Sequence, residues 1–171
     1  MDKRQARAFE EFVLESGSAL FRMAILLTSN RAEAEDLYQE TLQRLASRWS
    51  RVGNPRAFCR RVMNNLIIDE RRSSARRPRR EPLGDDHPTS DISSSDAQQA
   101  VELRGALLQA LDALSPQQRA VVVLRYFDDR SEAEVAELLD VSPGTVKAAA
   151  SRAMARLRSD SDLIDLLCPN P

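Results

Sequence analysis

Apolar side chains recur at helical spacing in both halves of the chain, and no segment shows the strict alternation of a half-buried β-strand. In the first half, an apolar stripe runs through residues 9–27, breaks at 28–30 and resumes over 37–49. Asn54 and Pro55 supply a third helix start. We expect the inward face of that helix to hold Phe58, Val62, Leu66 and Ile67.

The second half of the chain opens with a leucine-rich helix and continues with capped helical segments. The apolar positions of the first helix are Val101, Leu103, Leu107, Leu108, Leu111 and Leu114. Ser115, Pro116 and Gln118 then provide a capped start for the next helix, and the β-branched run 121–123 lies inside it. These patterns predict an all-α fold.

Between the two helical halves lies a segment with several prolines and many serines, and with no repeating apolar face. Such a composition favours a flexible linker that joins two small helical domains. The predicted boundaries are 1–74 for the first domain, 75–98 for the linker, 99–160 for the second domain and 161–171 for a C-terminal tail. The short amphipathic stretch of that tail would either pack on the second domain or bind a regulator.

The stretch 130–158 carries start signals for two successive helices. Ser131 and Glu134 have capping-box spacing, and Ser142 precedes a proline at the first helical position. The turn between the two helices is too short to hold another element, and Asp140 within it tolerates a left-handed backbone. The stretch therefore predicts a helix-turn-helix in the second domain.

The second helix of this motif is slim and cationic on one side. Val146 and Ala149 are expected to face inward by helical spacing, and residues 143–158 contain four basic side chains and no acidic one. A slim basic helix fits the major groove of DNA, although an ordinary solvated face would have the same composition. The candidate contact residues are Thr145, Lys147, Ser151, Arg152 and Arg156.

The net charge of −1 conceals an uneven distribution along the chain. Residues 1–80 hold 17 basic and 10 acidic side chains, a net charge of +7, whereas 81–100 carry −5 and 101–171 carry −3. Within 48–80, eleven arginines face only two acidic residues, which favours binding to a polyanion, with a merely solvated arginine face as the alternative. Trp49 beside this cluster would suit single-stranded DNA, where bases stack on rings, and would serve equally well as core.

Several classes of function are disfavoured by the composition. The single His87 and the distant Cys59 and Cys168 lack the spacing of a metal site, and we find no glycine-rich phosphate loop or acid–base pair in the sequence. We therefore expect no enzymatic activity, no cofactor and no metal. The charged N-terminus and the lack of a long apolar run predict a cytoplasmic protein without membrane insertion.

Three motifs together resemble the sigma-70 family of bacterial RNA polymerase sigma factors, extracytoplasmic-function group, over nearly the whole chain. The segment "AEDLYQETLQRL" resembles the core-binding helix of the family, and "NPRAFCRRVMNNLIIDERR" resembles its −10 recognition helix. Residues 114–153 resemble its −35 domain. The order of the three motifs is more specific than a helix-turn-helix alone, and it implies a subunit that gives polymerase its promoter specificity.

The resemblance also implies partners and contact residues. The clamp helices of the largest polymerase subunit would bind Asp36, Leu37, Gln39 and Glu40. The −10 element would be contacted by Trp49, Asn54, Arg61, Asn65, Arg71 and Arg72. The −35 element would meet the five candidate residues of the helix-turn-helix, and the flap of the second polymerase subunit would be a further partner. An anti-sigma protein is left open as a partner.

Two departures from the family pattern affect these expectations. Ala148 and Ala149 replace polar residues that are common in the family, so base readout is expected to depend on the neighbouring cationic side chains and on DNA shape. Cys59 and Arg60 replace bulky apolar or aromatic residues in the −10 helix. The alternative function is a stand-alone helix-turn-helix repressor or activator, which would explain 131–158 but not the arginine cluster or the linker.

Overall fold

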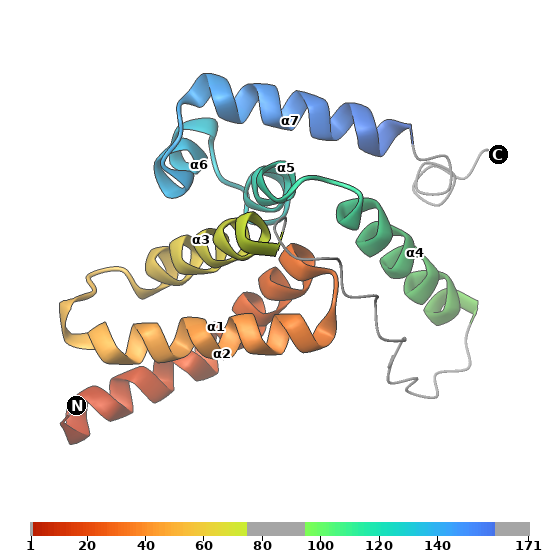
Figure 1. The fold of residues 1–171 in the computed structure, drawn as a ribbon. Coiled ribbons are helices and arrows are strands. Elements are labelled where there is room, and N and C mark those ends of the chain that lie inside the picture. The colour runs from red at the N-terminus through yellow and green to blue at the C-terminus, as the bar shows by residue number, and fades with distance from the viewer. Residues whose placement is uncertain (1, 75–94, 160–171) are drawn as a thin grey trace.

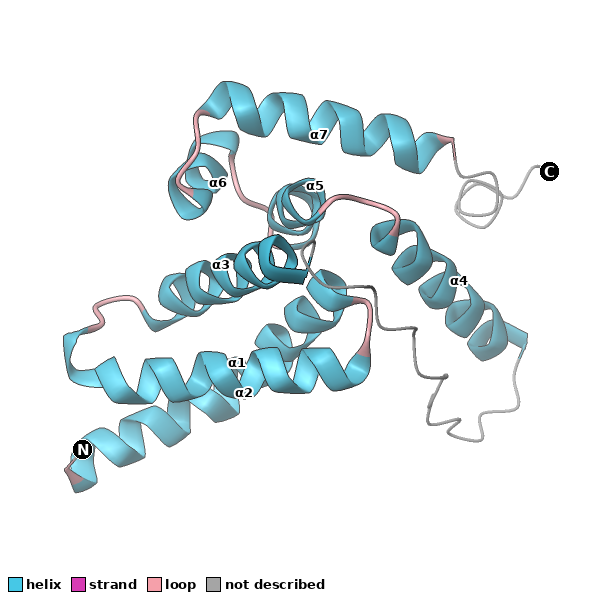
Figure 2. Cartoon of the chain, viewed as in Figure 1, coloured by secondary structure: helices cyan, strands magenta, loops and turns pink. Residues whose placement is uncertain are grey.

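The computed structural model describes residues 2–74 and 95–159, and every regular element in these two ranges is helical (Figure 1, Figure 2). The first range contains α1 (Lys3–Thr28), α2 (Arg31–Arg48), the 3₁₀ turn η1 (Trp49–Arg51) and α3 (Pro55–Ser74). The second contains α4 (Ser95–Asp112), α5 (Pro116–Val122), the π-helical turn η2 (Val123–Phe127), α6 (Glu132–Leu139) and α7 (Pro143–Arg158). The all-α prediction is confirmed.

Part of the predicted linker falls within the described residues, whereas the predicted C-terminal tail does not. Helix α4 begins at Ser95, so the last four residues assigned to the linker are helical. The rest of the linker and the C-terminal tail lie outside the described residues.

The predicted break between the first two helices is present and has a clear local cause. Ser29 adopts a left-handed conformation, with φ of 58°, and its N–H donates to the Ile25 carbonyl at 2.8 Å. Asn30 then caps α2 by accepting a hydrogen bond from the Glu33 N–H at 3.1 Å. A left-handed residue followed by an amide cap ends one helix and starts the next within two residues.

The inward face of α3 is shifted from the predicted one. The side chains that the structure buries are Cys59, Met63, Asn64 and Ile67, while Phe58 and Leu66 are only partly buried against the core. Helical spacing alone favoured the larger apolar side chains, but α3 packs on α1 and α2 along one side and on α5 and α6 along another. Small and slender side chains occupy the crowded line between these neighbours.

The C-terminal helices begin where their capping residues predict. Ser115 with Gln118 and Ser131 with Glu134 both form reciprocal capping boxes, which satisfy backbone N–H groups at the starts of α5 and α6. The run of valines at 121–123 is helical, as expected, but the helix widens into the π turn η2 directly after it. Such turns are rare and insert one extra residue into the helical register.

The two helical domains pack against each other. One hydrophobic cluster includes Leu27 and Leu45 of the first domain together with Leu124 and Val135 of the second. In Figure 1, α3 lies between the α1–α2 pair and the helices α5 and α6. The tethered domains expected from the sequence therefore share a core in this structure.

Arg119 is a fully buried charge at this junction. Its Nη1 donates to the Leu27 carbonyl at 3.0 Å and to the Ser29 hydroxyl at 3.3 Å, and its Nη2 pairs with Asp112 at 2.7 Å. A cation at the C-terminal end of α1 complements the exposed carbonyls and the helix dipole there. Arg119 thus joins the end of α1 to α4 and α5.

The packing predicts a contrast between two leucines of α1. Leu27→Ala should lower the free energy of unfolding by about 2–5 kcal/mol, because Leu27 is fully buried and its truncation leaves a cavity. Leu14→Ala should change it by no more than about 0.5 kcal/mol, because Leu14 is 84% exposed. Urea unfolding followed by circular dichroism measures both values. Equal losses in the two variants would contradict this core assignment.

Candidate polymerase and nucleic-acid interfaces

The helix-turn-helix is formed by α6 and α7, joined by a tight turn. Asp140 has φ of 53° and ψ of 50°, the left-handed conformation that the sequence analysis expected it to tolerate. The Val141 N–H closes the turn on the Ala136 carbonyl at 3.0 Å. Ser142 then caps α7 by accepting from the Thr145 N–H at 3.1 Å. These bonds fix the direction in which α7 leaves the turn.

The predicted inward and outward faces of α7 are both present. Val146 and Ala149 are buried, as expected, and Ala150 and Ala153 extend the same face. Lys147, Ser151, Arg152 and Arg156 are exposed, and none of the three cations forms an ion pair with another described residue. Thr145 differs from the other candidates because its hydroxyl lies 2.9 Å from that of Ser142, within the helix cap. Four of the five candidates therefore form one open cationic surface.

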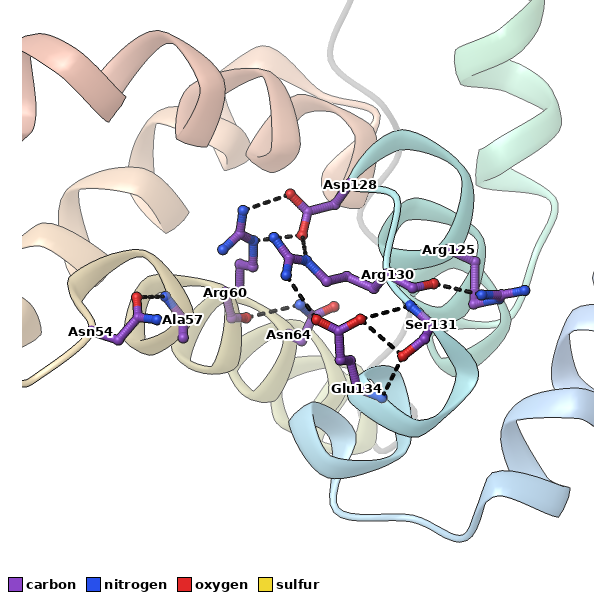
Figure 3. Close-up of polar contacts among 9 residues, drawn as sticks. All are labelled: Asn54, Ala57, Arg60, Asn64, Arg125, Asp128, Arg130, Ser131 and Glu134. Carbon is purple, nitrogen blue, oxygen red and sulfur yellow. Dashed lines mark hydrogen bonds and ion pairs between the residues drawn. The ribbon is translucent and has the colours of Figure 1, made fainter.

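A chain of charges supports the start of α6 (Figure 3). Asp128 accepts from Arg130 Nε at 2.9 Å, and Arg130 Nη1 donates to Glu134 at 2.9 Å. Glu134 also accepts from the Ser131 N–H at 2.9 Å and from its hydroxyl at 2.8 Å. The Ser131 N–H, its hydroxyl and the Arg130 guanidinium together lower the pKa of Glu134 to about 2. The cap is therefore ionised at neutral pH.

The candidate polymerase-binding face lies on α2. Asp36 and Gln39 are exposed there. Glu40 is partly exposed and forms an ion pair with Arg44, one turn further along, at 2.7 Å. Leu37 does not belong to this surface, because it is 6% exposed and lies in the core under α1. The face consists of two acidic residues and an amide, and Leu37 positions the helix that carries them.

The candidate −10 residues divide into exposed and structural groups. Asn65 is exposed on α3, as is Arg61. Asn54 accepts from the Ala57 N–H at 3.1 Å and so caps α3 with its side-chain carbonyl. Trp49 packs edge-on against Phe9, with ring centroids 5.3 Å apart, so part of its ring belongs to the core. The four residues lie on η1, on the turn before α3, and on α3 as far as Asn65.

Arg71 and Arg72 lie on the last turns of α3, and their side chains fall outside the described residues. Cys59, which departs from the family pattern, lies in the core. Burial raises the pKa of the Cys59 thiol to about 11, so this thiol is protonated at neutral pH. Its small size fits the crowded side of α3.

Polar contacts that cross between the domains were not predicted from the sequence, and one of them involves Arg60 on α3. Arg60 of α3 donates from Nη2 to Asp128 at 2.8 Å, and its Nε forms an ion pair with the same carboxylate. Figure 3 shows Arg60 and Arg130 converging on Asp128 from opposite domains. These partners are 68 residues apart, and no spacing pattern signals such a pair.

Each of the two domains matches a known protein family. Residues 12–77 match the description "Sigma-70 region 2", and residues 104–157 match "Sigma-70, region 4". The first match contains the candidate faces on α2 and α3, and the second contains the helix-turn-helix.

Curated relatives are similar over most of their length. The chain is 38% identical to the "RNA polymerase sigma-E factor" of Streptomyces avermitilis over 161 residues, which cover 92% of this chain and 87% of that protein. It is 36% identical to "ECF RNA polymerase sigma factor SigL" of Mycobacterium tuberculosis over 150 residues, 84% of this chain and 83% of that protein.

A solved structure has a similar arrangement of helices. It is that of the sigma factor RpoE from Bartonella quintana in complex with the anti-sigma factor NepR. The TM-score is 0.69 with 26% sequence identity, over 92% of this chain and 98% of that one. Among the described residues, no helix has the length and apolar character needed to cross a membrane.

The capping box of α6 gives a titration prediction. Since the folded pKa of Glu134 lies near 2 and its ordinary value is 4.5, its stabilising contribution is complete above about pH 4.5 and is lost as the pH falls towards 2. Ser131→Ala should raise the pKa of Glu134 towards 4.5, because two hydrogen bonds to the carboxylate weaken or disappear. Carbon-detected NMR titration of the side chain measures both values. A parent chain in which Glu134 titrates near 4.5 would contradict the capping geometry.

Proposed function

Since the chain belongs to the extracytoplasmic-function group of the sigma-70 family of RNA polymerase sigma factors, we propose that its exposed faces on α2, α3 and α7 are the contacts through which it works. It is an alternative sigma factor that directs RNA polymerase to promoters. This residue-level proposal rests on one observation. Helices α2, α3 and α7 each present an exposed polar face, while the opposite side of each helix forms part of the core.

The face on α2 binds the clamp helices of the largest polymerase subunit. Asp36 and Gln39 are exposed at the centre of that face, and Glu40 lies one turn before Arg44, its ion-pair partner. An exposed ion pair of this kind contributes only about 0.3–0.5 kcal/mol to a helix, so Glu40 can exchange Arg44 for a cation of the polymerase at little cost. Leu37 fixes the orientation of α2 from below.

The −10 element meets η1 and α3. Asn65 and Arg61 present an amide and a cation on the exposed side of α3, and the side-chain amide nitrogen of Asn54 lies at the start of the same helix. Stacking on the accessible part of Trp49 and cation contacts to phosphates suit a single-stranded segment. Arg71 and Arg72, which follow in the sequence of α3, are proposed as further phosphate contacts.

The −35 element meets α7. Arg152 has a long side chain that ends in a planar guanidinium group, which can donate hydrogen bonds to guanine O6 and N7 together. Lys147 lies nearer the start of the helix and is better placed to contact a phosphate. Ser151 and Arg156 flank Arg152 on the exposed side. Thr145 contributes through the cap that orients α7.

The proposed role is non-enzymatic and is carried out in the bacterial cytoplasm, where polymerase acts. A stand-alone repressor or activator is not favoured, because the region 2 match covers residues that such a protein would not need. The flap of the second polymerase subunit is a further proposed partner of the second domain. An anti-sigma protein is another, supported by the likeness to the Bartonella quintana factor solved with NepR.

The direct test is transcription with purified components. The full chain, added to core RNA polymerase, should co-purify with it and should start run-off transcripts from promoters selected by that holoenzyme. A stand-alone repressor would neither bind core nor start transcripts.

The α2 face gives a prediction on polymerase binding. Replacing Gln39 and Glu40 with alanine should leave the thermal unfolding midpoint nearly unchanged, because neither side chain is buried, and should weaken binding to core polymerase at least tenfold. Fluorescence anisotropy of the labelled factor measures the affinity. The matched control replaces Arg7 and Glu11, an exposed ion pair on α1, with alanine. The assignment of this face fails if the double variant binds core as tightly as the control.

The α7 face gives a prediction on base readout. Arg152→Ala should relax the preference at one or two positions of the −35 element, because a bidentate guanine contact carries about 1–3 kcal/mol of discrimination. Lys147→Ala should weaken all sequences alike, because a phosphate contact carries no base information. Both variants, as holoenzymes, are tested on a promoter library randomised through that element. If Arg152→Ala keeps the parent's preference at every position, bases are read elsewhere.

A further inference from the structure

A glycine occupies a buried position in the middle of α1. Gly17 lies well inside this helix, where an alanine would make the folding equilibrium more favourable by a factor of about two to five. Its φ is not positive, so the helical backbone at this position does not require glycine. The lack of a side chain therefore serves a neighbouring element.

That neighbouring element is α2, which packs beside α1 (Figure 1). A methyl group at Gly17 would lie 2.7 Å from the Tyr38 hydroxyl oxygen, whereas ordinary van der Waals contacts begin at 3.4 Å. Val13 and Phe21 lie one helical turn before and after Gly17 on the same face of α1. Gly17 is thus a gap between two larger side chains, and the tip of Tyr38 lies in it. We call this gap the Gly17 notch.

Neither Tyr38 nor α1 is free to give way. The Phe21 ring packs edge-on against the Tyr38 ring, with centroids 5.7 Å apart. Burial, and to a smaller extent Cys59, raises the pKa of Tyr38 above its ordinary value of 10, in agreement with a hydroxyl that points inward. Helix α1 is held at the same level by α3, because Ser16 accepts a hydrogen bond from Arg56 Nε at 3.0 Å. A methyl group in the notch would therefore displace α2.

A displacement of α2 changes the candidate polymerase-binding face. Gln39 follows Tyr38 directly and is exposed, and Asp36 and Glu40 lie on the same outer side of the helix. The backbone hydrogen bonds of a helix link successive turns, so its inner and outer sides move together. Hydrogen bonds between polar side chains form within about 2.7–3.2 Å, so a displacement of several tenths of an ångström weakens those made to a partner.

We infer that Gly17 is a positioning residue for polymerase binding. By accepting the tip of Tyr38, it sets how closely α2 lies against α1, and thereby where α2 presents Asp36, Gln39 and Glu40. Gly17 itself is buried and acts through Tyr38. This inference rests on the proposed function of the α2 face.

Four full-length chains test the notch: the parent, Gly17→Ala, Tyr38→Phe and the double variant. Tyr38→Phe removes the hydroxyl oxygen and so makes room for a methyl group. In the Tyr38→Phe background, Gly17→Ala should improve the folding equilibrium about two- to fivefold, because alanine is the better helix former. In the parent background it should lower the urea midpoint instead. Equal effects in the two backgrounds would show that the two positions are not coupled and would overturn the inference.

The affinity for core polymerase tests the positioning role. Folded Gly17→Ala should bind core about fivefold more weakly than the parent, as expected for the weakening of one hydrogen bond across the interface. The double variant should bind within twofold of the parent, because Tyr38→Phe lets α2 return. Fluorescence anisotropy measures all four affinities. The inference is wrong if folded Gly17→Ala binds core as tightly as the parent, or if the double variant binds as weakly as Gly17→Ala.

Gly105 provides a matched control. It is a helical glycine of α4, and no neighbouring atom lies within 4 Å of the place that a methyl group would take. Gly105→Ala should improve the folding equilibrium about two- to fivefold and leave the affinity for core unchanged. A fivefold loss of affinity in this control as well would contradict a specific role of Gly17.

A second variant decides the question if Gly17→Ala does not fold. Tyr38→Ala empties the notch from the other side and leaves α2 without its contact on α1. It should lower the affinity for core by a similar factor, whereas Tyr38→Phe should not. An unchanged affinity in folded Tyr38→Ala would overturn the positioning role.

The proposed function and the positioning role can fail separately. Amide NMR signals of Asp36, Gln39 and Glu40 in the free chain report the position of α2 without polymerase. They should shift in Gly17→Ala and return in the double variant. If the parent itself does not bind core, the proposed function fails, and these signals alone decide whether Gly17 sets the position of α2. If the parent binds core and Gly17→Ala shifts the signals without a loss of affinity, the function stands and the positioning role is refuted.

Discussion

Burial of α3 on two sides is the constraint on which the rest of the structure depends. Its slender residues Cys59 and Met63 have no exposed surface, because α1 and α2 pack along one side of the helix and α5 and α6 along the other. The same helix must also present Asn65 and Arg61 outward. A single helix thus supplies part of the core, the interface between two domains and a nucleic-acid face, which leaves little freedom for its sequence.

Most of the fold could be predicted from the sequence because each helix start is determined by a few neighbouring residues. The caps at Ser115, Ser131 and Ser142 each involve residues three apart, and all three form as expected. The turn at Asp140 and the inward positions of α7 followed from the same local rules. The cationic face of α7 could be predicted for the same reason, since a helix of known register fixes which side chains are exposed.

The remaining features depend on which elements meet, and no periodic pattern carries that information. Arg119 becomes fully buried only because the end of α1, some 90 residues earlier, offers it carbonyl and hydroxyl acceptors. In the sequence, Arg60 is one more member of a basic cluster, whereas in the structure it pairs with Asp128 of the other domain. The family resemblance placed Leu37 among the residues bound by the polymerase, whereas in the structure it is 6% exposed because α1 packs over it. Long-range polar pairs and the exact inward face of a doubly packed helix therefore had to come from the structure.

We expect α3 and α7 to engage different promoter elements when both domains are bound to polymerase. Photo-crosslinking tests this expectation most directly, with a photoreactive amino acid at position 65 on α3 or at position 151 on α7 of the holoenzyme on a promoter of known start site. Crosslinks should form from position 65 to the −10 element alone and from position 151 to the −35 element alone. Crosslinks from both positions to one element, or from position 151 to the −10 region, would contradict this expectation.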